Sequence, residues 1–147
     1  MQHDTGINAV AHAIQLAVAP VFLLSGIGAV LAVLTNRLSR IIDRGRALDS
    51  HLVTGLPADA AASTHAELLA LSRRARLISR AITLCTVTAL LVCAVIATLF
   101  VGAFVGFDAS MPVALLFVAA MVAFFGGLLS FLREIFIATA NLRIGPH

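Results

Sequence analysis

The sequence predicts an all-α protein: a three-helix transmembrane bundle with the first two helices extended into a cytoplasmic antiparallel helical hairpin. Composition, three long apolar stretches and one arginine-rich polar segment predict this fold. Hydrophobic residues make up 61% of the 147 residues and charged residues 12%, with a mean hydropathy of +1.05. A soluble domain of this size needs more polar residues to cover its surface. The excess apolar surface is therefore expected to face lipid or sister subunits.

The apolar stretches predict transmembrane helices at about residues 8–35, 81–106 and 111–133 of a single membrane domain, 1–147. Each exceeds the roughly 20 residues that an α-helix needs to cross a bilayer. A short turn separates the second helix from the third, with Ser110 near the N-cap and Pro112 at the first helical position. The chain is thus expected to cross the membrane three times.

The arginines predict the orientation of these crossings. All ten basic residues other than histidine are arginines, and eight of them lie in the polar segment 36–80. Three crossings place Arg133 and Arg143 on the same side as that segment, and Asp4 and Asp108 on the other. Because positive loops stay in the cytoplasm, we expect a multi-pass protein of the bacterial inner (plasma) membrane. Its N-terminus is expected outside and its C-terminus in the cytoplasm.

The polar segment 36–80 is predicted to form the cytoplasmic hairpin. Its turn is expected near Pro57, and Thr64 with Glu67 has the spacing of a capping box for the returning helix. A turn centred there would place Arg46 opposite Glu67. Exposed pairs of this kind stabilise by about 0–1 kcal/mol, so apolar contacts must also hold the hairpin together.

Glu134 is the most informative carboxylate of the sequence. It is expected at the cytoplasmic end of the third helix, at the depth of Arg37 and Arg80. A lone carboxylate at that depth is costly, whereas a carboxylate paired with arginine is satisfied. The three residues are therefore predicted to form a clasp between helix ends, or alternatively a charged ring at a pore mouth.

Further arginines are candidates for a basic vestibule or for binding anionic lipid head groups or anions, because clustered cationic side chains attract both. Their simpler explanation is membrane topology. These candidates are Arg40, Arg44, Arg73, Arg74 and Arg76.

A few polar residues and one proline interrupt the predicted crossings. His12 and Gln15 could line an aqueous vestibule, or form an interhelical hydrogen bond. Thr83 and Thr86 could line a polar path, but such hydroxyls more often bond to their own helix. Pro20 is expected to produce a kink, which is either static or a hinge.

No constellation in the sequence points to an enzyme, a metal site or a cofactor. No pair of titratable residues is placed for acid–base or nucleophilic chemistry, and His12 has no second ligand at metal-binding spacing. Trp and Tyr are absent, so a stacking platform for nucleic acid is not expected. We therefore predict no enzymatic activity, no cofactor and no nucleic-acid partner.

Small residues at four-residue spacing predict close helix packing, because lipid offers no hydrophobic drive for association. Gly102 and Gly106 form one such set, and Ala119, Ala123 and Gly127 form another. Small residues on adjacent faces of the third helix favour a homo-oligomer in the bilayer. The alternative is a tightly packed monomer.

Short motifs are spread along nearly the whole chain. They are residues 19–26 (APVFLLSG), 36–38 (NRL), Arg40, 43–46 (DRGR), 73–78 (RRARLI) and 133–135 (REI). Together these segments resemble a bacterial membrane family known as domain of unknown function 2721. The resemblance implies the three-helix topology, but it implies no activity.

Two functional hypotheses follow. The first is a homo-oligomeric inner-membrane protein forming an ion- or small-solute-conducting channel with a basic cytoplasmic vestibule. The second is a structural or regulatory membrane scaffold whose arginine-rich hairpin docks a cytoplasmic partner or anionic lipids. A conducting path lined by the first or second helix would favour the channel, and a sealed apolar axis the scaffold.

Overall fold

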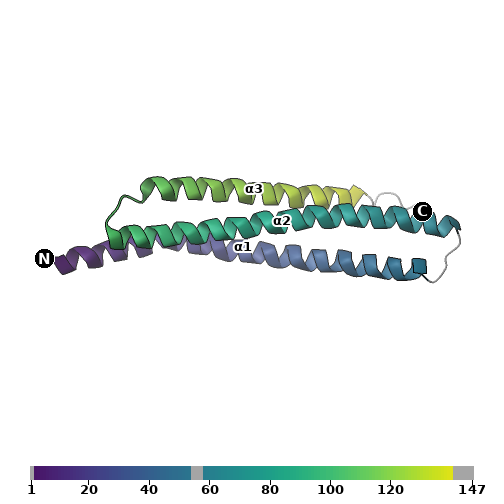
Figure 1. The fold of residues 1–147 in the computed structure, drawn as a ribbon, viewed down its shortest axis with the longest axis horizontal. Helices are drawn as coiled ribbons and strands as arrows, with labels where there is room; N and C mark the ends of the chain where they lie inside the picture. The colour runs from purple at the N-terminus through teal and green to yellow at the C-terminus, as the bar shows by residue number, and fades with distance from the viewer. Residues whose placement is uncertain (1, 54–57, 141–147) are drawn as a thin grey trace. The chain divides into compact units, whose positions relative to one another are not determined.

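The computed structural model describes residues 2–53 and 58–140, which form three α-helices (Figure 1). These are α1 (Gln2–Val53), α2 (Ala58–Val105) and α3 (Ser110–Ala140). All three are long and apolar enough to cross a membrane. The prediction of an all-α fold with three such helices is confirmed. Helix α1 continues well beyond residue 35, and α3 beyond residue 133, where the predicted crossings end.

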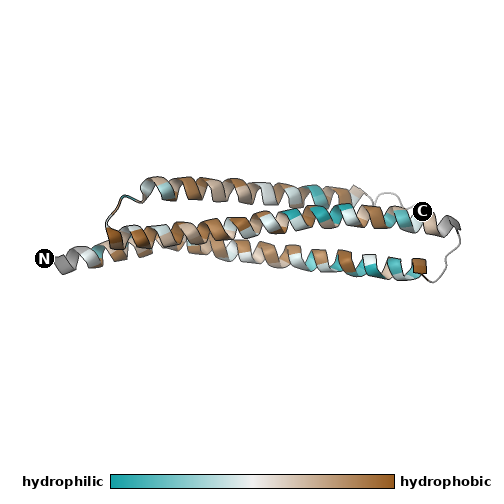
Figure 2. Cartoon of the chain, in the orientation of Figure 1, coloured by the Kyte–Doolittle hydropathy of each residue, from teal (hydrophilic) through white to brown (hydrophobic). Residues whose placement is uncertain are grey.

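The chain divides into two compact units, each containing part of every helix. The first unit comprises residues 1–31 and 84–125, and the second comprises residues 32–83 and 126–147. Hydrophobic residues dominate the first unit, whereas hydrophilic residues gather on α1 and α2 in the second (Figure 2). The arginine-rich segment 36–80 therefore belongs to the second unit.

Buried residues recur every seven positions along each helix. They are Ala13, Pro20, Ile27, Leu34 and Ile41 of α1, Leu71, Ile78, Cys85 and Val92 of α2, and Ala120, Gly127 and Glu134 of α3. Positions seven apart lie on one stripe of a helix, so such a repeat keeps a single seam facing the neighbouring helices. Most of the remaining side chains in the apolar stretches are exposed, and they are available to lipid or other chains.

Two glycines shape the turn between α2 and α3. Gly106 follows the last residue of α2 with a φ of +76°, and its N–H donates a 2.9 Å hydrogen bond to the carbonyl of Gly102. A glycine in this left-handed conformation commonly ends a helix in this way. A Cβ on Gly102 would lie 2.8 Å from the Cβ of Ala109. Both glycines thus shape this turn, and whether their spacing also forms an interhelical row stays a prediction.

Asp108 caps the start of α3. Its Oδ1 accepts a 3.0 Å bond from the backbone N–H of Ser110 and a 2.6 Å bond from the Ser110 hydroxyl. The helix begins at Ser110 itself, which places Pro112 third rather than first. Proline is still tolerated there, because the first turn has no helical partner for its N–H groups.

The Ser110 hydroxyl and then its N–H hold the pKa of Asp108 below its ordinary value. Because the folded pKa is the lower one, this interaction stabilises the fold above the unfolded pKa and is lost as pH falls through the folded pKa. We expect Ser110→Ala to raise the pKa of Asp108 toward its ordinary range, as measured by NMR titration of the carboxyl carbon. An unchanged titration would contradict the role of the hydroxyl.

Two details predicted for the segment 36–80 are wrong. Helix α2 begins at Ala58, so Thr64 and Glu67 lie inside it and do not cap its start. Glu67 accepts hydrogen bonds from Nε and Nη2 of Arg44, at 3.2 and 2.9 Å, instead of pairing with Arg46. This pair is largely exposed and contributes at most about 1 kcal/mol. The turn predicted at Pro57 lies outside the described residues.

Candidate functional site: a buried carboxylate held by two arginines

The most unusual side chain of the second unit is Glu134, which is fully buried although it carries a carboxylate. Its burial follows from its position, since it occupies the same seven-residue repeat of α3 as Ala120 and Gly127. Removing an ionised carboxylate from water costs several kcal/mol unless cationic partners and hydrogen bonds compensate. Glu134 therefore requires partners from the neighbouring helices.

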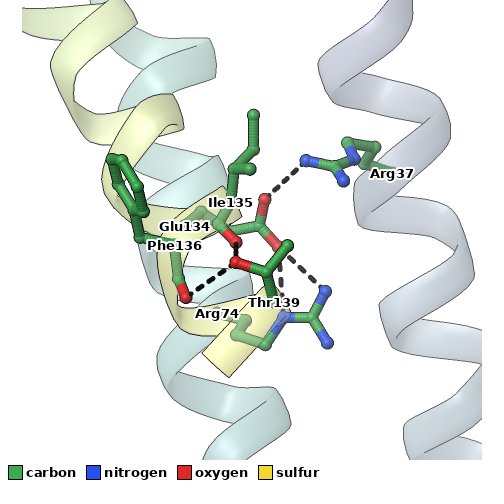
Figure 3. A network of polar contacts seen from close by, with 6 residues as sticks. All are labelled: Arg37, Arg74, Glu134, Ile135, Phe136 and Thr139. Carbon is green, nitrogen blue, oxygen red and sulfur yellow. Dashed lines mark hydrogen bonds and ion pairs between the residues drawn. The ribbon is translucent and has the colours of Figure 1, made fainter. Parts of the chain in front are cut away.

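Two arginines supply these partners (Figure 3). Nη1 of Arg37, on α1, lies 2.7 Å from Oε2 of Glu134. Arg74, on α2, approaches Oε1 with Nε at 3.1 Å and Nη2 at 2.9 Å. Both carboxylate oxygens are thus occupied by charge-assisted hydrogen bonds, which are the stronger kind. We call Arg37, Arg74 and Glu134 the arginine clasp.

One neighbouring group contacts the clasp, and another bonds to its own helix. The guanidinium carbon of Arg37 lies 5.3 Å from the centre of the Phe131 ring, within the range of a cation–π contact. On the next turn of α3, the Thr139 hydroxyl donates to the carbonyls of Ile135 and Phe136, at 3.0 and 3.2 Å (Figure 3). Among the described residues, no buried side-chain nitrogen or oxygen lacks a hydrogen-bond partner.

The structure places Arg74, and not the expected Arg80, against Glu134. The two arginines are six residues apart on α2, which separates them by roughly 9 Å along the axis and about 120° around it. Arg74 lies between the buried residues Leu71 and Ile78, so it faces the seam. The signal that identifies Arg74 is therefore the seven-residue repeat of α2, which sequence reasoning based on membrane depth overlooked.

Arg80 instead lines a separate cavity of about 460 Å³ in the second unit. The lining also includes Arg73, Arg76 and Arg133, with Leu77 and Ile137 as its apolar part. Of the remaining arginine candidates, Arg40 is exposed on α1 and Arg44 pairs with Glu67. The candidates grouped by sequence as one basic surface therefore separate into four environments: the clasp, the cavity, an exposed ion pair and the exposed surface of α1.

The polar candidates His12 and Gln15 of the first unit differ in their surroundings. His12 lines a mostly apolar cavity of about 610 Å³, which Pro20, Asp108 and Ser110 also border. Gln15 is exposed and is not part of this lining. Helix α1 is continuous through Pro20, and whether this residue acts as a hinge stays a prediction.

Hydroxyl groups of α2 bond mainly to their own helix. Thr83 donates to the carbonyl of Ser79 at 3.0 Å, Thr88 to Leu84 at 2.8 Å and Thr98 to Ala94 at 2.7 Å. Ser130 does the same on α3, at 2.9 Å from the carbonyl of Gly126. Thr86, the other candidate for a polar path, is exposed.

The arrangement of charges in the clasp favours a structural role. Both oxygens of the Glu134 carboxylate accept hydrogen bonds from arginines of two other helices, an arrangement that joins the three helices. Within residues 2–53 and 58–140, no group of three or more His, Cys, Asp or Glu side chains could hold a metal ion.

The sequence pattern of a family described as a protein of unknown function (DUF2721) matches residues 17–144. The chain belongs to this family. All three clasp residues, and the four arginines of the separate cavity, lie within the part that DUF2721 covers. Comparison with curated proteins gives no match, and comparison with solved structures gives none either. DUF2721 thus identifies the family without assigning an activity.

Proposed function

We propose that this protein is a non-enzymatic membrane scaffold of the bacterial inner membrane. Its N-terminus lies outside, and its arginine-rich hairpin, residues 36–80, lies in the cytoplasm, where it docks a cytoplasmic partner or anionic lipids. The observation that carries this proposal is the burial of Glu134 between Arg37 and Arg74.

The clasp supports a scaffold because it joins all three helices within the second unit. Arg37 comes from α1, Arg74 from α2 and Glu134 from α3. A buried charged group contributes little net stability, but any register that separates its members leaves an uncompensated charge. The clasp therefore selects one arrangement of the polar helices. A hairpin held in one arrangement suits docking better than a flexible loop does.

The polar groups of the apolar stretches also favour a scaffold over a channel. The hydroxyls of Thr83, Thr88 and Thr98 each donate to a carbonyl of their own helix. Such hydroxyls are less available to replace the hydration shell of an ion.

A homo-oligomeric channel is the second candidate, because much apolar surface is left for other chains. In the most apolar window of each helix, only 17% of α1, 22% of α2 and 11% of α3 is buried within the chain. Large side chains such as Phe22 and Phe104 are 76% exposed. Sister subunits could cover part of this surface and enclose an axis with a basic vestibule.

Thiol labelling of intact cells tests the orientation. In a Cys85→Ala/Cys93→Ala background, Met111→Cys at the start of α3 should react with a membrane-impermeant maleimide. Ser72→Cys, exposed on α2, should react only after the cells are permeabilised. If only Ser72→Cys is labelled in intact cells, the topology is the reverse of the proposed one and the hairpin does not lie in the cytoplasm.

Two measurements on purified protein separate the scaffold from the channel. The scaffold should give no ion or solute flux above that of empty liposomes, whatever its particle mass in mild detergent. If instead the protein forms a closed oligomer and conducts, and Arg40→Glu/Arg44→Glu changes the flux, these results would support the channel and refute the scaffold.

A further inference from the structure

Four arginines gather around one cavity of the second unit, apart from the arginine clasp. Arg73, Arg76 and Arg80 lie on α2, and Arg133 lies on α3. Residues at i, i+3 and i+7 share one helix face, so the three arginines of α2 point to the same side. We call these four residues the arginine pocket. Its volume is about 460 Å³, in the range of small-ligand sites.

No carboxylate of the described residues neutralises the arginine pocket. Its four guanidiniums take part in none of the ion pairs that join residues within 2–53 and 58–140. The nearest carboxylate in sequence is Glu134, adjacent to Arg133, and both of its oxygens are bound by Arg37 and Arg74. Within the part of the chain that the structure describes, the pocket therefore presents four positive charges without a carboxylate partner, an arrangement that favours an anionic ligand.

We propose that the arginine pocket binds the head group of an anionic phospholipid. The guanidinium fork matches the geometry of phosphate oxygens and can bind them through two parallel hydrogen bonds. The apolar lining, Leu77 and Ile137, suits the carbon atoms next to the head group. This inference rests on the proposed function, since it names the ligand of the arginine-rich helices.

The position of the pocket in the chain favours a lipid over a soluble anion. Arg133 follows directly on the apolar stretch of α3, and Arg80 directly precedes that of α2. Basic side chains at these boundaries lie at the depth of lipid head groups when the apolar stretches span the bilayer. A soluble phosphate would gain nothing from Leu77 and Ile137, whereas a lipid would use both parts of the lining.

Native mass spectrometry in mild detergent tests this assignment on the full chain. Protein mixed with cardiolipin, a phospholipid with two phosphates, should retain it, whereas phosphatidylcholine should not be retained. Arg76→Gln/Arg80→Gln should weaken cardiolipin binding roughly 25-fold, at about fivefold for each basic side chain near an anionic head group. Arg76→Lys keeps the charge but loses the guanidinium fork, so its cardiolipin affinity should lie between that of the wild type and that of Arg76→Gln/Arg80→Gln.

The matched control is Arg46→Glu, which lowers the net charge by the same two units at an exposed position of α1. Its binding should stay within about twofold of the wild type, since distant exposed charges are screened by salt. Equal losses of cardiolipin binding in Arg46→Glu and in Arg76→Gln/Arg80→Gln would overturn the pocket, as would unchanged binding in Arg76→Gln/Arg80→Gln. Circular dichroism and particle mass of each variant verify that the fold is intact.

Two further outcomes identify a different ligand or a different failure. Displacement of cardiolipin by excess inorganic phosphate would assign the pocket to a soluble anion and overturn the assignment of a lipid ligand. If cardiolipin binding fails while thiol labelling and flux agree with the scaffold, the lipid inference alone is wrong. If labelling places Ser72→Cys outside, the proposed function fails even where cardiolipin still binds in detergent.

Discussion

Glu134→Gln should destabilise the protein by about 2 kcal/mol, the range for removing one ionised partner of a buried hydrogen-bonded charge group. Glutamine keeps the shape of the side chain but cannot neutralise Arg37 and Arg74. These two side chains are 37% and 25% exposed, so water can recover part of the loss. In a thermal melt in mild detergent, Tm should fall by roughly 5–8 °C.

Glu67→Gln is the matched control, since it makes the same chemical change in an exposed ion pair with Arg44. Its effect should stay below about 1 kcal/mol. Glu134→Gln combined with Arg74→Gln should cost less than the sum of the two single changes, because residues of one network are coupled. Equal melting temperatures for Glu134→Gln and Glu67→Gln would show that the clasp does not stabilise the fold.

Gly102→Ala should destabilise the turn between α2 and α3 by about 1–3 kcal/mol, the usual cost of overpacking. The new Cβ would lie 2.8 Å from the Cβ of Ala109, a separation that requires the backbone to shift. The other atoms near it are farther away, with the carbonyl oxygen of Phe107 at 3.5 Å. Thermal melting in the same detergent measures the effect.

The second substitution Ala109→Gly should rescue Gly102→Ala, because it removes the one atom that the new Cβ meets closely. Gly45→Ala is the control for helix propensity. Its Cβ meets nothing within 4 Å in α1, so it should stabilise by about 0.5–1 kcal/mol. A double variant no more stable than Gly102→Ala would contradict the close approach as the cause.

The arginine clasp and the arginine pocket show how one helix separates similar residues. Arg73 and Arg74 are adjacent in the sequence, yet Arg74 binds Glu134 and Arg73 lines the pocket. Adjacent residues on an α-helix differ by about 100° in direction. A cluster of arginines in a helical sequence is therefore not one surface, and the two groups are expected to respond differently to substitution.

The amino-acid sequence by itself determined the helical class, the three apolar stretches and the resemblance to DUF2721, which the match over residues 17–144 confirms. These features follow from composition and from runs of similar residues, which do not depend on contacts between distant segments. The sequence also singled out Glu134 as a carboxylate in need of arginine partners. Burying a carboxylate at the end of an apolar helix is costly, whichever residues supply its partners.

Only the tertiary structure decided which arginines bind Glu134 and which residue pairs with Glu67. Arg74 rather than Arg80, and Arg44 rather than Arg46, were chosen by how the helices are rotated and shifted against each other. Rotation and shift depend on packing along the buried seams, and a change of two residues turns a side chain by about 200° around its helix. The charges in the sequence indicate that each of these two carboxylates pairs with an arginine, whereas helix packing determines which arginine it is.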